Sequence, residues 1–358
     1  MPALGGLFAA STTPSLNDAK IPNRRFLAAL FCLGFIRKDG VTHRINWRDL
    51  KTEELGSVYE SLLEIRPSLS AAGEFQLGSG AKGNDRKTSG SYYTPDSLVE
   101  CLLDSALDPV LERAEASGAT AAEKVAAILA LKVIDPACGS GHFLLGAARR
   151  MADRFARLRN EDAGKEDVQA ALRDVVSRCI HGVDRNPMAV ELAKVALWIE
   201  SVSPGQPLGF LDANIRCGDA LLGVFDLGAL DDGIPDEAYK PRTGDNKDAA
   251  KFYLQRNRDA KKGQGQLDFA AGGGAMPPRR MAAGLGTIKS MPEDTVGQVE
   301  KKRAAFEAWK ADPARWNVAV ACDLYMAAFL LPKVEVPASH LRGLVPTTAE
   351  VRTKLAGV

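Results

Sequence analysis

The sequence predicts an α/β protein in which a parallel sheet is covered by helices, with an α-helical region before it. Two observations support this fold class. Short apolar runs at 132–135, 180–184 and 215–217 have the length of buried strands, and two of them end in an aspartate. The segments between them have the apolar spacing of helices. Strand, helix, strand, helix, strand in this order is the βαβ pattern of a parallel sheet.

Composition sets the outer limits of this interpretation. The 358 residues allow two domains, or one domain with large additions. The chain has 46 basic and 45 acidic residues, a net charge of +1. This balance excludes a protein whose whole surface is basic and binds nucleic acid, but it does not exclude a local basic patch. No run of eighteen apolar residues occurs, and Met1–Thr13 lacks the pattern of a secretion signal. We therefore expect a cytoplasmic protein that does not enter a membrane.

The six cysteines are scattered singly, and no CxxC pair is found. This spacing favours neither a zinc site nor a disulfide framework. We expect buried free thiols in a reducing compartment and no metal. His43 and His340 have no neighbours in the sequence that suggest a metal site.

The first 90 residues are expected to be helical and separate from the rest. Phe26–Phe35 is an apolar block, and a second set of apolar residues has the spacing of one helix face, which Pro67 would end. That set is Leu55, Val58, Tyr59, Leu62 and Leu63. Leu77–Ser91 is rich in glycine, serine and charge, and is predicted to be a mobile loop.

The elements of the second region follow in order. Thr94 is the predicted N-cap of a helix with Pro95 at its first position. A set of apolar residues would give that helix its buried face, and Ala121–Leu131 continues helically. The set is Leu98, Val99, Leu102, Leu103, Ala106 and Val110. The predicted strands and helices that follow are Lys132–Asp135, Ser140–Leu158, a helix closing at Arg173–Cys179, Ile180–Asp184, Pro187–Ser201 and Ile215–Cys217.

The character of the sequence changes after Phe225. Lys240–Lys262 carries eight basic and three acidic residues, and Gly263–Gly286 holds seven glycines. We expect a flexible insertion here, in which the basic stretch is either a solvated segment or a DNA contact. Helical patterning returns at Thr295–Lys310 and Ala314–Leu331, and no element is expected from Pro332 onward. The predicted domains are 1–90, 91–236, 237–292 and 293–358.

The most informative stretch is Val133–Leu145, VIDPACGSGHFLL, a strand, a glycine loop and a helix start. Gly139 and Gly141 would let a ligand approach the backbone closely, at the carboxyl end of a parallel strand. The third glycine of a dinucleotide fingerprint is missing, and the loop has no lysine for a phosphate. Asp135 would repel phosphate and suit a cationic sulfonium or amino group, which favours S-adenosylmethionine. The alternative is a purely structural turn.

Two further acids follow the next strands. Asp184 ends Ile180–Asp184, where a carboxylate can accept from ribose hydroxyls, although it could instead cap the helix at Pro187. It lies 49 residues after Asp135, against about 20 in a compact dinucleotide fold. Asp219 follows the third strand, where it could accept from an adenine amino group or serve as a turn residue.

Four ordered segments carry a resemblance to a known family. They are GSYYTP (Gly90–Pro95), DPACGSGHFLL (Asp135–Leu145), GVDRNPMAVELAKVALW (Gly182–Trp198) and IRCGDALLG (Ile215–Gly223). In sequence and order they resemble the motifs of gamma-class N6-adenine DNA methyltransferases, and more narrowly the large single-chain enzymes of restriction-modification and phage-defence systems. The resemblance covers Leu50 to about Asp236, and again about Ala314–Leu331.

The resemblance implies a partial Rossmann-like methyltransferase sheet, S-adenosylmethionine as cofactor and double-stranded DNA as partner. It also implies roles by position. Tyr93, Thr94 and Pro95 would line the methionine end of the cofactor, Asp184 would bind its ribose and Asp219 its adenine. The residues implied for the main loop and the pocket floor are Asp135, Ala137, Gly139, Gly141, His142 and Phe143.

One departure from the family concerns catalysis. The family's (Asn/Asp/Ser)-Pro-Pro-aromatic motif, which accepts from the target amino group and stacks on the flipped base, has no match. Asn186-Pro187-Met188 has one proline, and Met276-Pro277-Pro278-Arg279 lacks both the polar residue and the aromatic. We therefore expect no catalytic residue in this chain, and a downstream polypeptide that supplies the motif and the target reader. The alternatives are a non-catalytic scaffolding subunit of a defence complex and, more remotely, a nicotinamide-dependent oxidoreductase.

Overall fold

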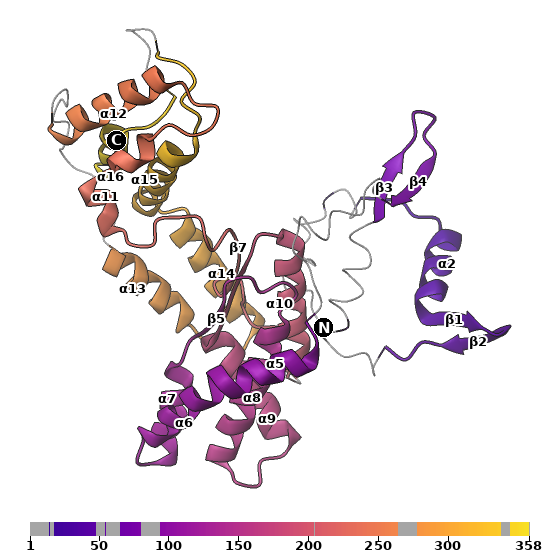
Figure 1. The fold of residues 1–358 in the computed structure, drawn as a ribbon. Helices are drawn as coiled ribbons and strands as arrows, with labels where there is room; N and C mark the ends of the chain where they lie inside the picture. The colour runs from indigo at the N-terminus through magenta and orange to yellow at the C-terminus, as the bar shows by residue number, and fades with distance from the viewer. Residues whose placement is uncertain are drawn as a thin grey trace. The chain divides into compact units, whose positions relative to one another are not determined.

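The computed structural model describes residues 18–47, 65–79, 94–203, 205–263, 278–337 and 344–357, together with Pro14 and Glu54. The chain divides into two compact units. Figure 1 draws the described helices and strands of both. One comprises Met1–Gly218 and Glu293–Val299, and the other comprises Asp219–Pro292 and Glu300–Val358. In the described part of the chain no helix is long and apolar enough to cross a membrane.

The N-terminal region contains two β-hairpins besides a helix, which corrects the expectation of a purely helical segment. The elements are α2 (Asn23–Gly34), β1 (Phe35–Lys38), β2 (Val41–Arg44), β3 (Ile65–Leu69) and β4 (Phe75–Ser79). Both residues of the turn between β1 and β2, Asp39 and Gly40, have positive φ, as a two-residue hairpin turn requires. The Asp-Gly pair was therefore a hairpin signal that the apolar-block reasoning missed.

Pro67 does not end a helix but lies inside β3, which pairs with β4. Proline is tolerated there because each strand of a two-stranded sheet is an edge. The residues predicted as a helix at 55–63, and the predicted loop from 80 to 91, lie outside the described residues. Leu77–Ser79 belongs to β4 rather than to that loop.

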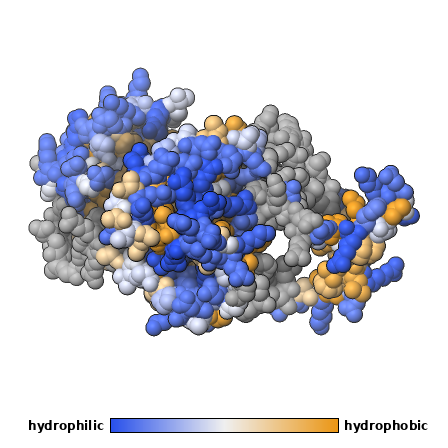
Figure 2. Space-filling model, turned by 90° about the horizontal axis from the view of Figure 1, so that it is seen from below, coloured by the Kyte–Doolittle hydropathy of each residue, from blue (hydrophilic) through white to orange (hydrophobic). Residues whose placement is uncertain are grey.

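Apolar side chains of α2 are exposed. Figure 2 shows hydrophobic residues, in orange, on the N-terminal elements at its right.

The helical lead into the sheet is α5 (Asp96–Leu102), the π-helical turn η2 (Leu103–Leu107), α6 (Asp108–Ala116) and α7 (Ala121–Ala130). Pro95, rather than Thr94, is the N-cap of α5. From α5 to α6 the buried residues are Val99, Leu103, Leu107 and Leu111, a spacing of four. Leu98 and Leu102, predicted to be buried, are 58% and 47% exposed. The π turn adds a residue to one helical turn, which keeps Leu107 and Leu111 in line with Val99 and Leu103.

The sheet is parallel, as predicted, although its first strand is not buried as expected, since Ile134 is 65% exposed. It consists of β5 (Val133–Asp135), β6 (Ile180–Asp184) and β7 (Ile215–Cys217), with β6 in the middle. The helices between them are α8 (His142–Arg159), α9 (Lys165–Arg178) and α10 (Pro187–Ser201). The core of this unit is centred on α8, whose Leu144, Met151 and Phe155 are fully buried. The carboxyl ends of all three strands therefore meet at one edge.

The second unit is helical, and several of its helices lie where the sequence predicted none, among them the helix Pro278–Lys289 within the expected flexible insertion. Its elements are α11 (Gly228–Asp232), η3 (Asp236–Tyr239), α12 (Lys247–Lys261), α13 (Pro278–Lys289), α14 (Val296–Lys310, of which the first four residues belong to the other unit), α15 (Pro313–Leu330) and α16 (Thr348–Leu355). The basic stretch expected in a flexible insertion forms α12, with Tyr253 and Asn257 buried. Helix α16 lies in the tail where no element was expected, although Thr347 and Glu350 form a capping box that the sequence displays.

Candidate cofactor-binding site

The loop between β5 and α8 is held against the end of β6 by backbone hydrogen bonds. The Cys138 amide donates to the Val183 carbonyl at 2.9 Å, and the Gly141 amide donates to the Cys138 carbonyl at 2.8 Å. Within the loop, the Ala137 amide donates to Asp135 Oδ1 at 3.0 Å. These bonds give the loop a defined position at the carboxyl end of the sheet.

The two loop glycines have different roles. Both have positive φ, +54° at Gly139 and +91° at Gly141, which favours glycine at both positions. A Cβ at Gly141 would lie 3.2 Å from the Ala193 Cβ on α10, so this residue also allows close packing of loop and helix. A Cβ at Gly139 would meet no atom within 4 Å. Gly139 therefore leaves open space in which a ligand can reach the backbone.

Asp184 joins the loop to the end of β6. Its Oδ2 accepts from the Gly139 amide at 2.9 Å, and its Oδ1 accepts from the Asn186 amide at 2.8 Å. The N-cap of α10 is Asn186, whose side chain accepts from the Met188 amide. Capping of the Pro187 helix is thus performed by Asn186, and each oxygen of Asp184 keeps further acceptor capacity.

The electrostatics of the loop disfavour an anion. Partial burial raises the pKa of the Asp135 carboxyl, against the Ala137 hydrogen bond, and the negative charge of Asp184 raises it further. Burial, together with the two carboxylates, raises the pKa of the Cys138 thiol to about 12. A cation at this site would offset the unfavourable charge of Asp135.

Thr94, Pro95, His142 and Phe143 lie at the starts of α5 and α8. His142 Nε2 and Asp96 Oδ1 are 3.0 Å apart, which ties the two helix starts together. Phe143 is partly buried and packs against the core, Thr94 is partly buried and Pro95 is exposed. Tyr93 lies outside the described residues.

Asp219 follows Gly218, whose amide donates to the Asp184 carbonyl at 2.9 Å. The Asp219 carboxylate accepts from the Leu221 amide at 2.9 Å, which is a local turn contact. Asp219 belongs to the second compact unit, whereas the other candidate residues belong to the first. No group of His, Cys, Asp and Glu that could hold a metal is found among the residues described.

Sequence reasoning missed three residues that position this site. Asn186 caps α10, Ala193 packs under Gly141, and Asp96 pairs with His142. The Asn-Pro pair at 186–187 was a readable helix-start signal. The contacts of Ala193 and Asp96 join segments about fifty residues apart in the chain and leave no local pattern.

The cysteines are all free, as expected, but only Cys138 and Cys179 are buried, and Cys32, Cys101 and Cys217 are exposed. A thiol reacts as its thiolate, and burial raises the pKa of Cys179 to about 11. We expect an alkylating reagent at mildly alkaline pH to modify the three exposed cysteines of the folded protein and to spare Cys138 and Cys179. Peptide mass spectrometry checks this, and rapid modification of Cys138 would show that the loop opens.

Comparison with known proteins shows which family this site resembles. Residues 111–206, which include the loop and Asp184, match the model of the DNA-methyltransferase domain of MmeI. The resemblance to DNA methyltransferases is confirmed. The matched segment contains β5, β6 and the helices α8 to α10, and with them Asp135, Gly139 and Asp184. Thr94 and Asp219 lie outside the match.

Two relatives extend the same resemblance. The chain is 24% identical over 263 residues to a predicted type II restriction enzyme and methyltransferase of Methanocaldococcus jannaschii, a match that covers 62% of this chain. It is 36% identical over 118 residues, 33% of this chain, to the adenine-specific methyltransferase PglX of Streptomyces coelicolor. The matches span only 21% and 8% of those relatives.

Proposed function

We propose that this chain binds S-adenosylmethionine for the transfer of a methyl group to N6 of adenine in double-stranded DNA. The observation that carries this proposal is the open space at Gly139 beside the carboxylates of Asp135 and Asp184. When bound, the cofactor supplies an electrophilic methyl group on a sulfonium cation. The similarity of residues 111–206 to a DNA-methyltransferase domain supports the same reaction class.

The donor and acceptor set fits this cofactor. Asp135 offers a carboxylate in a setting that favours a positive neighbour, which suits the sulfonium or amino group. Asp184 has acceptor capacity for ribose hydroxyls beyond its two amide bonds. Asp219 is proposed to accept from the adenine amino group, and Tyr93, Thr94 and Pro95 to line the methionine end. The chain's own part is then to orient the donor for in-line transfer.

Catalysis on adenine needs an acceptor for the amino group and an aromatic platform for the flipped base. The printed sequence has no (Asn/Asp/Ser)-Pro-Pro-aromatic motif. We therefore propose that polypeptide outside this sequence supplies these groups and the target reader. A second candidate function, favoured by the same observation, is that of a non-catalytic cofactor-binding subunit of a restriction or phage-defence complex.

Calorimetry on the purified chain tests cofactor binding. We expect S-adenosylmethionine to bind and NAD not to bind; the reverse result would overturn the proposal in favour of an oxidoreductase. A methylation assay on DNA separates the two candidates. Robust turnover by this chain alone would contradict the need for an external motif. Turnover only after a polypeptide bearing the motif is added would favour the methyltransferase over the scaffold.

Asp135→Asn separates the charge of this residue from its hydrogen bond. The amide oxygen can still accept from the Ala137 amide, but the buried negative charge next to Asp184 is removed. Because the pKa of Asp135 is higher in the folded than in the unfolded protein, the wild-type fold loses stability as the pH rises through the folded-state pKa. The asparagine variant cannot ionise and does not lose this stability. We expect unchanged or higher thermal stability at neutral pH and weaker S-adenosylmethionine binding. Unchanged affinity in calorimetry would refute the role of the charge.

A further inference from the structure

Helix α12 in the second unit gathers positive charge on one face. Successive residues of a helix differ by about 100°, so five cations fall within an arc of about 100°. These residues, which we name the α12 basic face, are Lys247, Lys251, Arg258, Lys261 and Lys262. The opposite side of the helix, with Ala249, Tyr253 and Asn257, is buried. The fold therefore converts a basic stretch of sequence into one row of about 22 Å, which includes the C-cap residue Lys262 and in which Lys261 is partly buried.

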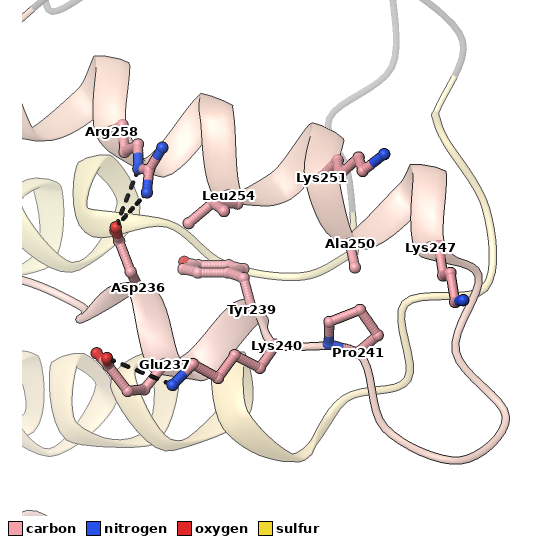
Figure 3. Close-up of a pocket in the computed structure, with 10 residues that line it drawn as sticks. All are labelled: Asp236, Glu237, Tyr239, Lys240, Pro241, Lys247, Ala250, Lys251, Leu254 and Arg258. Carbon is pink, nitrogen blue, oxygen red and sulfur yellow. Dashed lines mark hydrogen bonds and ion pairs between the residues drawn. The ribbon is translucent and has the colours of Figure 1, made fainter.

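Neighbouring acidic residues neutralise the charge of only one residue of the α12 basic face among those that the structure describes. Arg258 forms an ion pair with Asp236 at 2.8 Å, and outside the row Lys240 pairs with Glu237 (Figure 3). The carboxylate of Asp245 is used by the amides of Arg242 and Lys333. None of the four lysines of the α12 basic face forms an ion pair with a residue that the structure describes. The remaining acids of the helix, Asp248 and Asp259, lie on its flank.

Helix stability does not explain the first two lysines. Cations are favourable near the C-terminus of a helix and unfavourable near its N-terminus. Lys261 and Lys262 lie at the C-terminal end, where they favour the helix. Lys247 is the first residue of α12, where its charge opposes the helix dipole, and Lys251 lies one turn later, where the dipole gives its charge no stabilisation. An external anion is the partner that would make these two charges favourable.

Beside the row lies a hollow of about 420 Å³ between η3 and α12. Its floor is apolar, with Tyr239 buried beneath Leu254 and Ala250, and Lys247 and Lys251 at its rim (Figure 3).

A duplex carries one phosphate per about 3.4 Å of each strand, so a row of about 22 Å spans several of them. We propose that the α12 basic face contacts the phosphate backbone of duplex DNA, an inference that rests on DNA being the substrate under the proposed function.

Salt dependence of DNA binding tests this surface directly. Each phosphate contact adds about 0.9 to the slope of log affinity against log salt. The double variant Lys247→Gln/Lys251→Gln should lower the slope by about 1.8, so that the affinity lost between ~50 and ~200 mM salt becomes about tenfold smaller. Fluorescence anisotropy with a short duplex, using the full chain, measures this. The loss should be the same for duplexes of unrelated sequence, because phosphate contacts carry no sequence information.

The matched control is Lys165→Gln/Lys301→Gln, which removes the same charge from two exposed lysines on α9 and α14. Its slope should equal that of the wild type. Equal slopes for the wild type and the α12 variant, or an equal reduction in the control, would overturn the assignment of this face. Absence of DNA binding by the wild type would overturn it as well. Calorimetry with S-adenosylmethionine reports separately on the cofactor part of the proposed function, and thermal unfolding verifies that the variants fold.

Discussion

Asp184→Ala is expected to weaken S-adenosylmethionine binding by about 10- to 100-fold, since hydrogen bonds to a charged group contribute about 1.5–3 kcal/mol. The same change removes the acceptor for the amides of Gly139 and Asn186. We therefore also expect the free energy of unfolding to fall by about 1–3 kcal/mol. Calorimetry and denaturant unfolding measure the two effects on one preparation.

Two further variants separate binding from loop support. Asp184→Asn keeps one oxygen that can accept an amide but loses the charge, so its stability loss should be the smaller. Asp162→Ala makes the same truncation at an exposed position between α8 and α9, where it should leave both quantities unchanged. Wild-type cofactor affinity in Asp184→Ala would refute the ribose assignment. Wild-type stability would refute its part in holding the loop.

Gly182→Ala is expected to lower the free energy of unfolding by about 1–3 kcal/mol through overpacking. Gly182 lies in β6 below the loop, and a Cβ there would come within 2.8 Å of Leu144 Cδ1 and 3.0 Å of Cys138 Sγ. The Cys138 Cβ, at 3.1 Å, cannot move away without moving the loop backbone. Cofactor affinity should therefore fall together with stability.

Gly218→Ala is the matched control, because it adds the same methyl group at the end of the neighbouring strand β7. Its Cβ would lie 4.0 Å from Val183 Cγ1, an ordinary contact. Adding Cys138→Ala to Gly182→Ala removes the sulfur and should restore part of the lost stability. Wild-type unfolding of Gly182→Ala, or no difference between the two glycine variants, would contradict the close packing under the loop.

Local patterns predicted the elements of the sheet with good boundaries. The strands Ile180–Asp184 and Ile215–Cys217 and the helix Pro187–Ser201 match the structure because short apolar runs and a proline in the first helical turn are local signals. The buried stripe of α5 and η2 could not be predicted in the same way. Its spacing of four depends on a π turn at Leu103–Leu107, and no residue type in the sequence marks that turn.

Helix α12 shows why a charge-rich stretch was taken for a flexible one. Only its buried side identifies it as part of a core, and that side is held by distant partners. Asn257 is fully buried, donates to the Ile234 carbonyl and accepts from the amide of Thr348, 91 residues away. A buried amide is stable only when such partners are present, and composition cannot reveal them.

The sequence by itself determined the order of strands and helices, the acids at the strand ends and the glycines between β5 and α8, because each depends on neighbours a few residues away. Only the tertiary structure decided which of these residues meet. Asp184 binds the amide of Gly139, 45 residues earlier, because parallel pairing of β5 and β6 brings the two strand ends side by side. It also decided that the cations of α12 and its C-cap residue Lys262 share one face, since a helix puts on one side residues that the sequence spreads over sixteen positions.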